Sequence, residues 1–535
     1  MTSNLTYDTL TAYIDGLHTT DSTLTPTDYT KIIDYILANG ETTNTPRDLI
    51  QLRRGNESDL PLLAQGEPAF TLDTGKFFVG GENGNVEIGV TFTNVKANGA
   101  KGDGSTDDTA NIQSTLNNGG VIIFPPGTYE ISSPLTIQSG TRIIGSGATL
   151  QVTTGFPNNR GIFENSDTVN GNTDISVEDI SFDFSLNSQA GMKAVWYQKC
   201  QRVKVIACKT EQGGDVIAFT GCTDYAAMGN VCLSSIGQTV IDNWGGCKNG
   251  VISNNRIDGN TGGPGCGILV SGFNTGLSAN TTEGISVVGN VIRNVSLGIY
   301  LQGGTDGTTP GLVKDCVVTG NTIDTTTKSH GIYLTETQNC VISDNVIKDI
   351  YQVGIMVTKM TNGAVSTDCV ISSNVLDNIN TSSTVGNSAI HFESGSDNNV
   401  VIGNHLKNVS TCNACILLYQ ANNNVVSDNY FDTAKYTAIS RNGDTGNLIK
   451  NNMGYNPIGH QTPPTVPAAS TAIQNPFGVD CMVVVTGGSG VNVGIGSTSN
   501  TTPTGITDGV VMVPANGYVD LGTYTTAPTW TWYGF

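Results

Sequence analysis

The sequence predicts an all-β protein built around a single-stranded parallel β-helix, and a repeated phrase together with the composition supports this. A short phrase of β-branched residues around a shared Asn recurs through the middle of the chain. Its copies are VISNNRI (251–257), VVGNVI (287–292), VVTGNTI (317–323), VISDNVI (341–347), VISSNVL (370–376), VVIGNHL (400–406), VVSDNYF (425–431) and LIKNNMG (448–454). The shared Asn residues are separated by 35, 31, 24, 29, 30, 25 and 23 residues, a period typical of solenoids. With 66 Gly and only 13% charged residues, the composition disfavours long amphipathic helices.

Each phrase predicts a strand, a sharp bend at the Asn and a second strand. Asn tolerates left-handed backbone angles and forms local hydrogen bonds, so equivalent bends can stack their Asn side chains in a column. A second phrase, such as GIYL at 298–301 and 331–334, follows most bends and supplies a third strand. Twelve coils stacked at roughly 4.8 Å would extend about 60 Å. A β-sandwich would need frequent hairpins but no long-range repeat.

Four segments follow from a pass along the chain. Residues 1–45 contain helix-like stretches near 6–16 and 27–39 and are expected to form an attachment or oligomerisation segment. Residues 46–91 are predicted to form a small β module. The β-helix is expected over 92–460, with weaker repeats that bend near Gly147, Asp179, Cys208 and Asn230.

A Pro-rich stretch at 461–467 marks the end of the repeats. Beyond it, strands are predicted at 481–485, 509–513 and 518–521, and they indicate a β-sandwich over 465–535.

The charge balance bears on the partners of the chain. A formal net charge of −20 with only 25 Lys and Arg disfavours nucleic acid and anionic membranes as partners. Basic and apolar signal regions are absent from the N-terminal stretch MTSNLTYDTL, and no apolar run approaches 18 residues. We therefore expect no membrane insertion, and export through assembly or lysis if the protein acts outside a cell.

Twelve cysteines are too few in 535 residues to indicate a disulfide scaffold. Cys316, Cys340 and Cys369 each lie five residues before a shared Asn, so stacked coils would align them as a buried column close enough for a disulfide. Cys412 and Cys415 form a CxxC pair without a second pair or a nearby His, which does not indicate a metal site. Neither a metal nor a cofactor is expected.

The segment 94–113, NVKANGAKGDGSTDDTANIQ, followed by GGVIIFPPGTY at 119–129, resembles the N-terminal capping motif of the pectate-lyase-like superfamily of right-handed β-helices. In that superfamily the loop and the short helix after it cover the open end of the solenoid, which would otherwise expose strand edges and core. Asp107 and Asp108 at the helix start suit an N-cap, so we interpret them as structural.

Two flanking segments resemble parts of bacteriophage proteins. Residues 50–80 look like the small module near the N-termini of tail fibres and tailspikes, and 475–532 is similar to terminal domains of minor structural proteins. The resemblance implies a homotrimeric tailspike in the virion tail, assembled in the host cytoplasm. It also implies docking on tail or baseplate proteins through the N-terminal region, and binding and often cleavage of a bacterial surface polysaccharide.

Glycoside hydrolysis needs two carboxyl groups about 5 Å apart for retention or about 6.5–9.5 Å apart for inversion. Outward-facing acids one or two coils apart on a β-helix satisfy this requirement. Asp215 (GGDVIAF) and Asp242 (TVIDNW) are predicted in successive coils at similar points, with Trp244 as a sugar platform. GGDVIAF also resembles the aspartate strand of polygalacturonases, although their neighbouring motifs are absent here.

Glu336 (GIYLTE) and Glu393 (AIHFES) form a second candidate pair, about two coils apart. His330 and His391 lie near them in sequence. By strand alternation Tyr300, Tyr333 and Tyr419 are predicted on the same outer face. These residues also have a non-functional interpretation. Outward Glu and Tyr side chains are common on any solvated surface, and His330 is expected to be one of the residues that stack between coils.

A glycoside hydrolase is therefore the leading hypothesis. A polysaccharide lyase would need a base together with a cation that neutralises a uronate, and the basic residues are scattered. A non-enzymatic receptor-binding fibre on the same scaffold remains the alternative from another class.

Overall fold

The computed structural model describes residues 53–72, 76–88, 92–259, 265–272, 281–305, 310–359, 364–384, 386–409, 411–432 and 437–535. The helix-like stretches expected near 6–16 and 27–39 lie outside these residues. The chain divides into two compact units, Met1–Thr91 and Phe92–Phe535. No helix of the described residues is long and apolar enough to cross a membrane.

The first unit contains a four-stranded sheet. Its elements are β1 (Arg53–Gly55), a 3-10 turn (Glu57–Asp59), β2 (Pro68–Thr71), β3 (Phe77–Gly81) and β4 (Gly84–Ile88). Strand β1 pairs with β2 in parallel, whereas β2, β3 and β4 pair antiparallel. Its buried apolar core consists of Leu63, Ala69 and Phe78.

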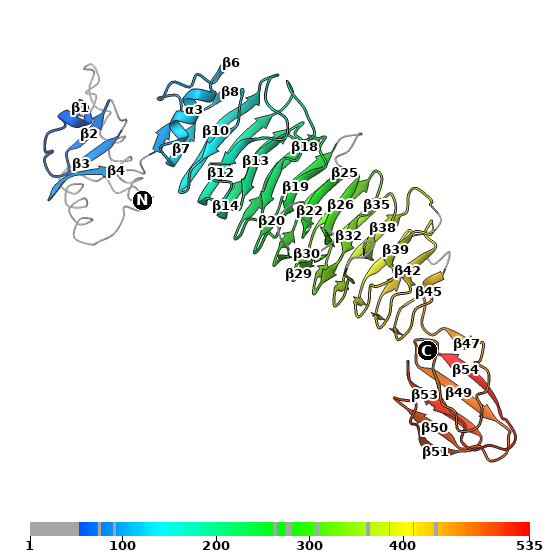
Figure 1. The fold of residues 1–535 in the computed structure, drawn as a ribbon. Coiled ribbons are helices and arrows are strands. Elements are labelled where there is room, and N and C mark those ends of the chain that lie inside the picture. Colours follow the sequence, from blue (N-terminus) through cyan, green and yellow to red (C-terminus); the bar gives the residue numbers. More distant parts are fainter. Residues whose placement is uncertain are drawn as a thin grey trace, which may run out of the picture. The chain divides into compact units, whose positions relative to one another are not determined.

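The second unit begins with a cap formed by β5 (Phe92–Asn94), β6 (Asp103–Asp107) and helix α3 (Thr109–Leu116), and Figure 1 shows α3 at the start of the stacked strands. Asp108 is fully buried and its carboxylate accepts the backbone N–H groups of Lys101 and Gly102, at 2.6 and 2.8 Å. Asp108 is the N-cap residue of α3, as expected, but its side chain makes no capping bond because the loop uses this carboxylate. Asp107 instead accepts the N–H of Thr109 at 3.1 Å.

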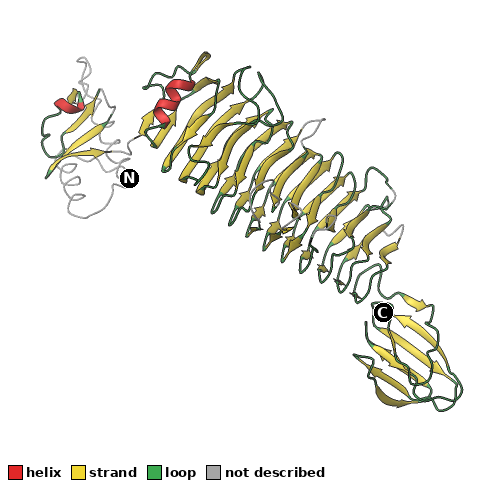
Figure 2. Cartoon of the chain, in the orientation of Figure 1, coloured by secondary structure: helices red, strands yellow, loops and turns green. Residues whose placement is uncertain are grey.

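Parallel strands then stack coil upon coil into a right-handed β-helix, and Figure 2 shows the strands that dominate it. The first face comprises β7 (Gly120–Phe124), β10 (Thr141–Val152), β12 (Thr173–Asp183), β14 (Gln201–Ile206), β17 (Ala226–Met228), β20 (Val251–Ser253), β24 (Ser286–Val288), β30 (Val317–Thr319), β34 (Val341–Ser343), β37 (Val370–Ser372), β40 (Val400–Ile402), β43 (Val425–Ser427) and β46 (Leu448–Lys450). The second face comprises β8 (Gly127–Ile131), β15 (Lys209–Glu211), β18 (Val231–Ser235), β21 (Arg256–Gly259), β25 (Val291–Val295), β31 (Thr322–Thr326), β35 (Val346–Ile350), β38 (Val375–Ile379), β41 (His405–Lys407) and β44 (Tyr430–Phe431). The long strands β10 and β12 bend through both faces.

The third face is a twelve-stranded parallel sheet, and it carries most of the candidate site residues. Its strands are β9 (Leu135–Ile137), β11 (Gly161–Asn165), β13 (Lys193–Gln198), β16 (Ile217–Thr220), β19 (Thr239–Trp244), β22 (Cys266–Ser271), β26 (Leu297–Gln302), β32 (Ile332–Thr335), β36 (Ile355–Thr358), β39 (Ser388–Phe392), β42 (Ala414–Tyr419) and β45 (Thr437–Asn442). Short strands β23 (Thr282–Glu283), β29 (Val313–Lys314) and β33 (Thr337–Gln338) form an extra ladder, and β27 (Gly304–Thr305) pairs with β28 (Pro310–Gly311). The predicted all-β parallel β-helix is confirmed.

The repeated Asn forms the expected column, but it does not itself adopt the left-handed conformation. The residue before it does, as at Asn254 (φ 55°), Asp344 (φ 56°) and Gly289 (φ 66°). Each Asn then points inward and donates its Nδ2 to the Oδ1 of the Asn one coil further on. The ladder runs through Asn230, Asn255, Asn290, Asn321, Asn345, Asn374, Asn404, Asn429 and Asn452, with distances of 2.9–3.0 Å.

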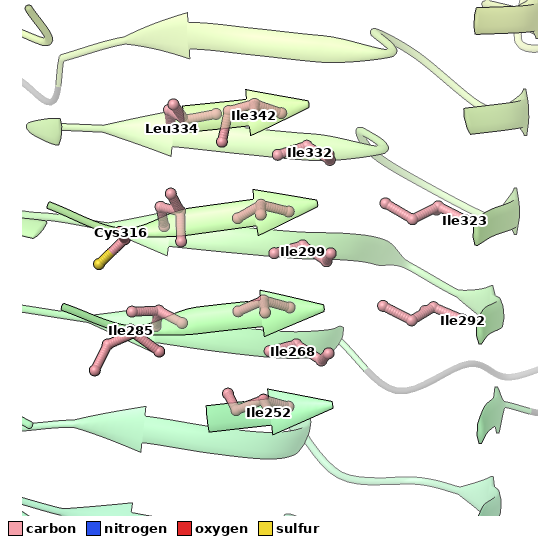
Figure 3. Close-up of a cluster of buried hydrophobic side chains, with 14 of the residues drawn as sticks. Ile252, Ile268, Ile285, Ile292, Ile299, Cys316, Ile323, Ile332, Leu334 and Ile342 are labelled. Atoms are coloured by element: carbon pink, nitrogen blue, oxygen red, sulfur yellow. The ribbon is translucent and has the colours of Figure 1, made fainter. Parts of the chain in front are cut away.

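The interior of the helix is a stack of equivalent apolar residues. Figure 3 shows Ile268, Ile299 and Ile332 in one column, and these residues are directly paired between strands. Cys316, Cys340 and Cys369 align in successive coils as expected, and all twelve cysteines are buried free thiols. This column continues as Asn399, Asn424 and Asn447, whose side chains join neighbouring coils.

The last part of the chain folds into two four-stranded antiparallel sheets. One contains β47 (Gly459–Gln461), β49 (Cys481–Thr486), β52 (Gly509–Val513) and β54 (Thr529–Gly534). The other contains β48 (Ile473–Gln474), β50 (Val493–Gly496), β51 (Thr502–Ile506) and β53 (Tyr518–Asp520). The two sheets are those of the predicted β-sandwich.

Candidate functional site

The outward side chains of the twelve-stranded sheet form one surface, which we call the outer strip, and of the four candidate acids Asp242 lies on a strand of it. Strand register aligns its central row, and the residues before and after most members of the row on each strand are buried in the helix interior. In order along the helix the row is Glu164, Trp196, Ala218, Asp242, Leu269, Tyr300, Tyr333, Met356, His391, Leu417 and Ser440. Trp244 and Tyr419 lie two residues beyond Asp242 and Leu417 and therefore face the same side.

Asp215 is held at the edge of the strip by three donors. Its Oδ1 accepts the backbone N–H groups of Gln238 and Thr239 at 3.1 and 2.9 Å, and its Oδ2 lies 3.4 Å from the Nζ of Lys193. The prediction that Asp215 and Asp242 occupy similar points of successive coils is wrong, because Asp242 pairs with Ala218. The strand enters the sheet just after Asp215, so the two acids approach through their side chains.

Asp242 lies in a very different environment. It is 6% exposed, and its Oδ1 has no hydrogen-bond partner within the described residues. Burial raises the pKa of Asp242 to about 7; the nearby Asp215 charge adds to the shift, and Lys193 opposes it. A large share of this carboxyl group is therefore protonated at neutral pH.

Lys193 and Trp196 complete this end of the strip, and sequence reasoning missed both. The Nζ of Lys193 lies 5.0 Å from the centre of the Trp196 ring, and the indole Nε1 donates to Thr220 at 3.1 Å. The alternation in KAVWYQ could have placed Trp196 on the outside. Nothing local indicated that Lys193 would reach Asp215 in the next coil.

Further along the strip, Tyr300 stacks on Tyr333 with ring centroids 4.7 Å apart and ring planes 10° from parallel. The His330 ring contacts Tyr333 edge-on at 4.9 Å, and its Nδ1 accepts the N–H of Val353. Burial lowers the pKa of His330 to about 4, so its imidazole is neutral at pH 7.

The second carboxyl pair lies at strand ends: Glu336 follows β32 and Glu393 follows β39. Glu393 is 34% exposed in its side chain, its pKa is raised by burial, and its Oε1 lies 3.2 Å from the Nε2 of His391. Burial lowers the pKa of His391 to about 4, so this ring is also neutral at pH 7. The pKa of Tyr333 is raised by burial and by the charges of Glu336 and Glu393.

Glu336 corrects one expectation. The side chain was predicted on a solvated face, but the residue is fully buried at the turn from β32 to β33, with a left-handed φ of 47°. A Cβ added at Gly303 would lie 2.3 Å from the Cβ of Glu336, so the chain leaving β26 covers it.

The described residues contain no group of three or more His, Cys, Asp or Glu side chains that could hold a metal ion. The fold and the outer strip together define a parallel β-helix protein whose third face carries clustered carboxyl and aromatic groups. The family described as rhamnogalacturonase A/epimerase, pectate lyase-like matches residues 92–373, more than half of the chain, and the chain belongs to this family.

A second family, the major tropism determinant N-terminal domain, matches residues 50–81. This match falls on the segment that resembles the N-terminal module of phage tail fibres and tailspikes. Together, the two family matches support the resemblance to bacteriophage tailspike and tail-fibre proteins with a pectate-lyase-like β-helix.

Curated relatives match only short stretches. A probable glucan endo-1,3-beta-glucosidase of Arthroderma benhamiae is 38% identical over 85 residues, 13% of this chain and 10% of the relative. The non-secreted LysM effector LysM15 of Penicillium expansum is 42% identical over 69 residues, 10% of this chain and 5% of the relative. The match thus spans a tenth or less of these relatives' length.

Solved structures of low sequence identity show similar architecture. An exopolygalacturonase from Thermotoga maritima has a TM-score of 0.49 and 13% identity, covering 66% of this chain and 92% of that one. A tailspike protein of E. coli bacteriophage HK620, in complex with a pentasaccharide, has a TM-score of 0.48 and 10% identity, with coverage of 83% and 93%. The surface adhesin PfbA of Streptococcus pneumoniae has a TM-score of 0.47 and 18% identity, with coverage of 68% and 93%.

Proposed function

We propose that this chain is a phage tailspike that binds a bacterial surface polysaccharide along the outer strip and hydrolyses its glycosidic bonds. The observation that carries the proposal is the pairing of two carboxyl groups in contrasting environments. Asp242 is buried, with its pKa raised to about 7, whereas Asp215 is anchored by two backbone N–H groups and Lys193. Pairs of this kind divide the acid and base roles of glycoside hydrolysis.

In this reaction the protonated Asp242 donates its proton to the departing glycosidic oxygen. Asp215 acts on the opposite side of the sugar as general base or nucleophile. Aromatic side chains supply platforms for neighbouring sugar rings. The residues proposed to bind sugars are Trp244, Tyr300, Tyr333, His391 and Tyr419. Glu336 and Glu393, whose charges both raise the pKa of Tyr333, form the alternative carboxyl pair.

Incubation of the purified full chain with host polysaccharide tests hydrolysis, with fragments followed by mass spectrometry. We expect oligosaccharides without a new double bond, and their loss in Asp215→Asn and Asp242→Asn. Asp508→Asn is a matched control, because Asp508 is exposed in the bend between β51 and β52. If oligosaccharide release is lost in Glu336→Gln and Glu393→Gln instead, the second pair is the catalytic one.

A binding-only fibre is the second candidate, and burial of the acids favours it. Asp242 is 6% exposed and Glu336 is fully buried, so a sugar reaches either carboxyl group only if neighbouring side chains move. If the chain binds the glycan but releases no fragments after long incubation, it is a binding-only fibre. A lyase is less well supported, because Lys193, the cation nearest to the first pair, already contacts Asp215.

Location in the virion tail, with assembly in the host cytoplasm and docking on tail or baseplate proteins through the N-terminal region, is also proposed. The match of residues 50–81 to a phage tropism-determinant domain supports it. Mass spectrometry of purified virions would detect the chain, and removal of residues 1–91 should abolish its incorporation while leaving the β-helix unit soluble.

Self-association as a homotrimer is proposed as well, and the first face of the helix offers a surface for it. A column of outward residues runs over eight coils: Val251, Ser286, Val317, Val341, Val370, Val400, Val425 and Leu448, which we call the valine stripe. Parallel sheets are usually covered on both faces. Chains with a net charge of −20 repel one another, and this uncharged column is where two copies approach at least electrostatic cost.

A further inference from the structure

We infer that the outer strip selects a glycan without uronic acids, so that the substrate of this chain is a neutral polysaccharide. The inference rests on the proposed function, namely that the strip binds a glycan. It concerns the charge that the strip offers to its ligand, and the argument begins with the cations.

Three cations at the twelve-stranded sheet, Lys193, Arg160 and Arg441, are already engaged. Lys193 contacts Asp215 at 3.4 Å and the carbonyl oxygen of Gly191 at 3.0 Å. Arg160 forms a two-pronged pair with Glu164, at 2.9 and 2.6 Å, and Arg441 contacts Asp444 at 2.8 Å. A uronate carboxylate would have to displace one of these internal partners to find a counter-charge.

Carboxyl groups, by contrast, remain available on the strip. The Oδ1 of Asp242 has no hydrogen-bond partner among the described residues, and Glu393 is 34% exposed in its side chain. His330 and His391 do not offset these groups, because burial lowers both imidazole pKa values to about 4. An incoming uronate would therefore meet the Glu393 carboxylate with no cation in contact with it, whereas Asp242 is largely protonated at neutral pH and adds little charge.

The remaining surface suits uncharged sugars. The Tyr300–Tyr333 stack, Met356 and Leu417 provide apolar area for the C–H faces of sugar rings. His391 is 8% exposed; the Oε1 of Glu393 lies 3.2 Å from its Nε2, and its Nδ1 has no hydrogen-bond partner in the described part of the chain. A neutral imidazole offers one donor and one acceptor, which match a hydroxyl or an acetamido group.

Exposed lysines near this end of the strip are Lys328, two residues before His330, and Lys359. The side chain of Lys359 lies 2.9 Å from the position that a Cβ at Gly395 would take, two residues beyond Glu393. It forms no ion pair within the described residues.

An array of bacterial surface polysaccharides of known composition tests the inference. Each uronate-containing polymer is also printed after reduction of its carboxylates to primary alcohols, which changes charge but not linkage. We expect the full chain to bind polymers without uronic acids, and carboxyl reduction to strengthen binding about tenfold or more at low salt. Added salt should narrow this difference, because it screens exposed charge.

Two variants test whether the outer strip causes the preference for carboxyl-reduced polymers. Glu393→Gln should reduce the preference for reduced polymers several-fold. Glu211→Gln, which removes the same charge from an exposed position on the second face, should leave it unchanged. Binding confined to unreduced uronate polymers, or equal effects of the two variants, would overturn this inference alone. Absence of binding to every polymer would contradict the proposed function itself.

Discussion

The ring of Tyr300 lies parallel to the ring of Tyr333, with centroids 4.7 Å apart, on strands adjacent in the twelve-stranded sheet. The distance matches the separation of neighbouring parallel strands, so the coil repeat itself produces the stack. The pair forms a partly exposed aromatic surface between Asp242 and His391 in the central row of the outer strip.

Replacing Tyr333 by Ala should weaken glycan binding by about 3- to 10-fold, because a ring contact of this type contributes about 0.5–1.5 kcal/mol. Isothermal titration with a bound polysaccharide fragment measures the change. Tyr351→Ala is the control, since Tyr351 is 38% exposed outside the strip. Equal loss in both variants would argue against a sugar platform.

Asp242 should make the protein less stable as the pH rises. Its pKa is about 7 in the folded chain against an ordinary value of 3.8, so between these values unfolding releases a proton and the free energy of unfolding falls with pH. Above pH 7 Asp242 is ionised in the folded chain too, and the free energy of unfolding is lowered by the full amount. Asp242→Asn should therefore stabilise the protein at pH 8, by roughly 1–3 kcal/mol, and have little effect at pH 4.

Denaturant unfolding at the two pH values measures this difference. Asp508→Asn should show no such pH dependence. A stability gain in Asp242→Asn that is the same at pH 4 and pH 8 would show that ionisation of Asp242 is not its cause.

Cleavage should fall as Asp242 loses its proton. If Asp242 is the general acid, kcat/KM declines about tenfold per pH unit above pH 7, and Asp242→Asn lowers it by about 100-fold or more. A reducing-end assay across pH 5–9 measures both. Cleavage that keeps rising above pH 8 would exclude this assignment.

The Asn ladder should be costly to interrupt. Asn345→Ala removes the acceptor of the backbone N–H and Nδ2 of Asn321, and the donors to Asn374 and Val318. Buried groups left without partners each cost about 1–3 kcal/mol, so a loss of about 3 kcal/mol or more is expected. Thermal unfolding followed by circular dichroism measures it, and the exposed Asn413→Ala should change little.

The valine stripe should control self-association. In the double variant Val341→Asp and Val370→Asp, two buried like charges would face the neighbouring copy, so we expect monomers. Sedimentation velocity measures the mass against the 56.0 kDa of one chain. Val169→Asp alters a 71% exposed position outside the stripe and should leave assembly intact. A monomeric unmodified chain would contradict the trimer proposal.

Much of the fold could be predicted because a solenoid repeats local rules. The interval between shared Asn residues identified the coils, and the offset of five residues identified the Cys316–Cys340–Cys369 column. The same offset marks Asn399, Asn424 and Asn447, and the continuation of that column could have been predicted too. The sequence pattern predicted the left-handed conformation at the shared Asn, whereas the residue before it adopts that conformation. Both positions carry turn-forming residues, so the pattern does not distinguish them.

The candidate site was harder to predict, because it depends on contacts between coils. Strand alternation fixed which side of the sheet Tyr300, Tyr333 and Asp242 face. Register decided that Asp242 lies beside Ala218, and only the folded chain brings Lys193 to Asp215. Burial of Glu336 depends on how the chain leaves β26, which no periodic pattern encodes.

The sequence by itself thus determined the parallel β-helix, its Asn and Cys columns and the outward placement of the aromatic residues, since these follow from a repeat that acts over one or two coils. The tertiary structure decided which acid is buried and which is anchored. Burial and charge pairing arise from residues more than twenty positions apart, and it is they that set the protonation state of Asp242 and the charge that the outer strip presents to a glycan.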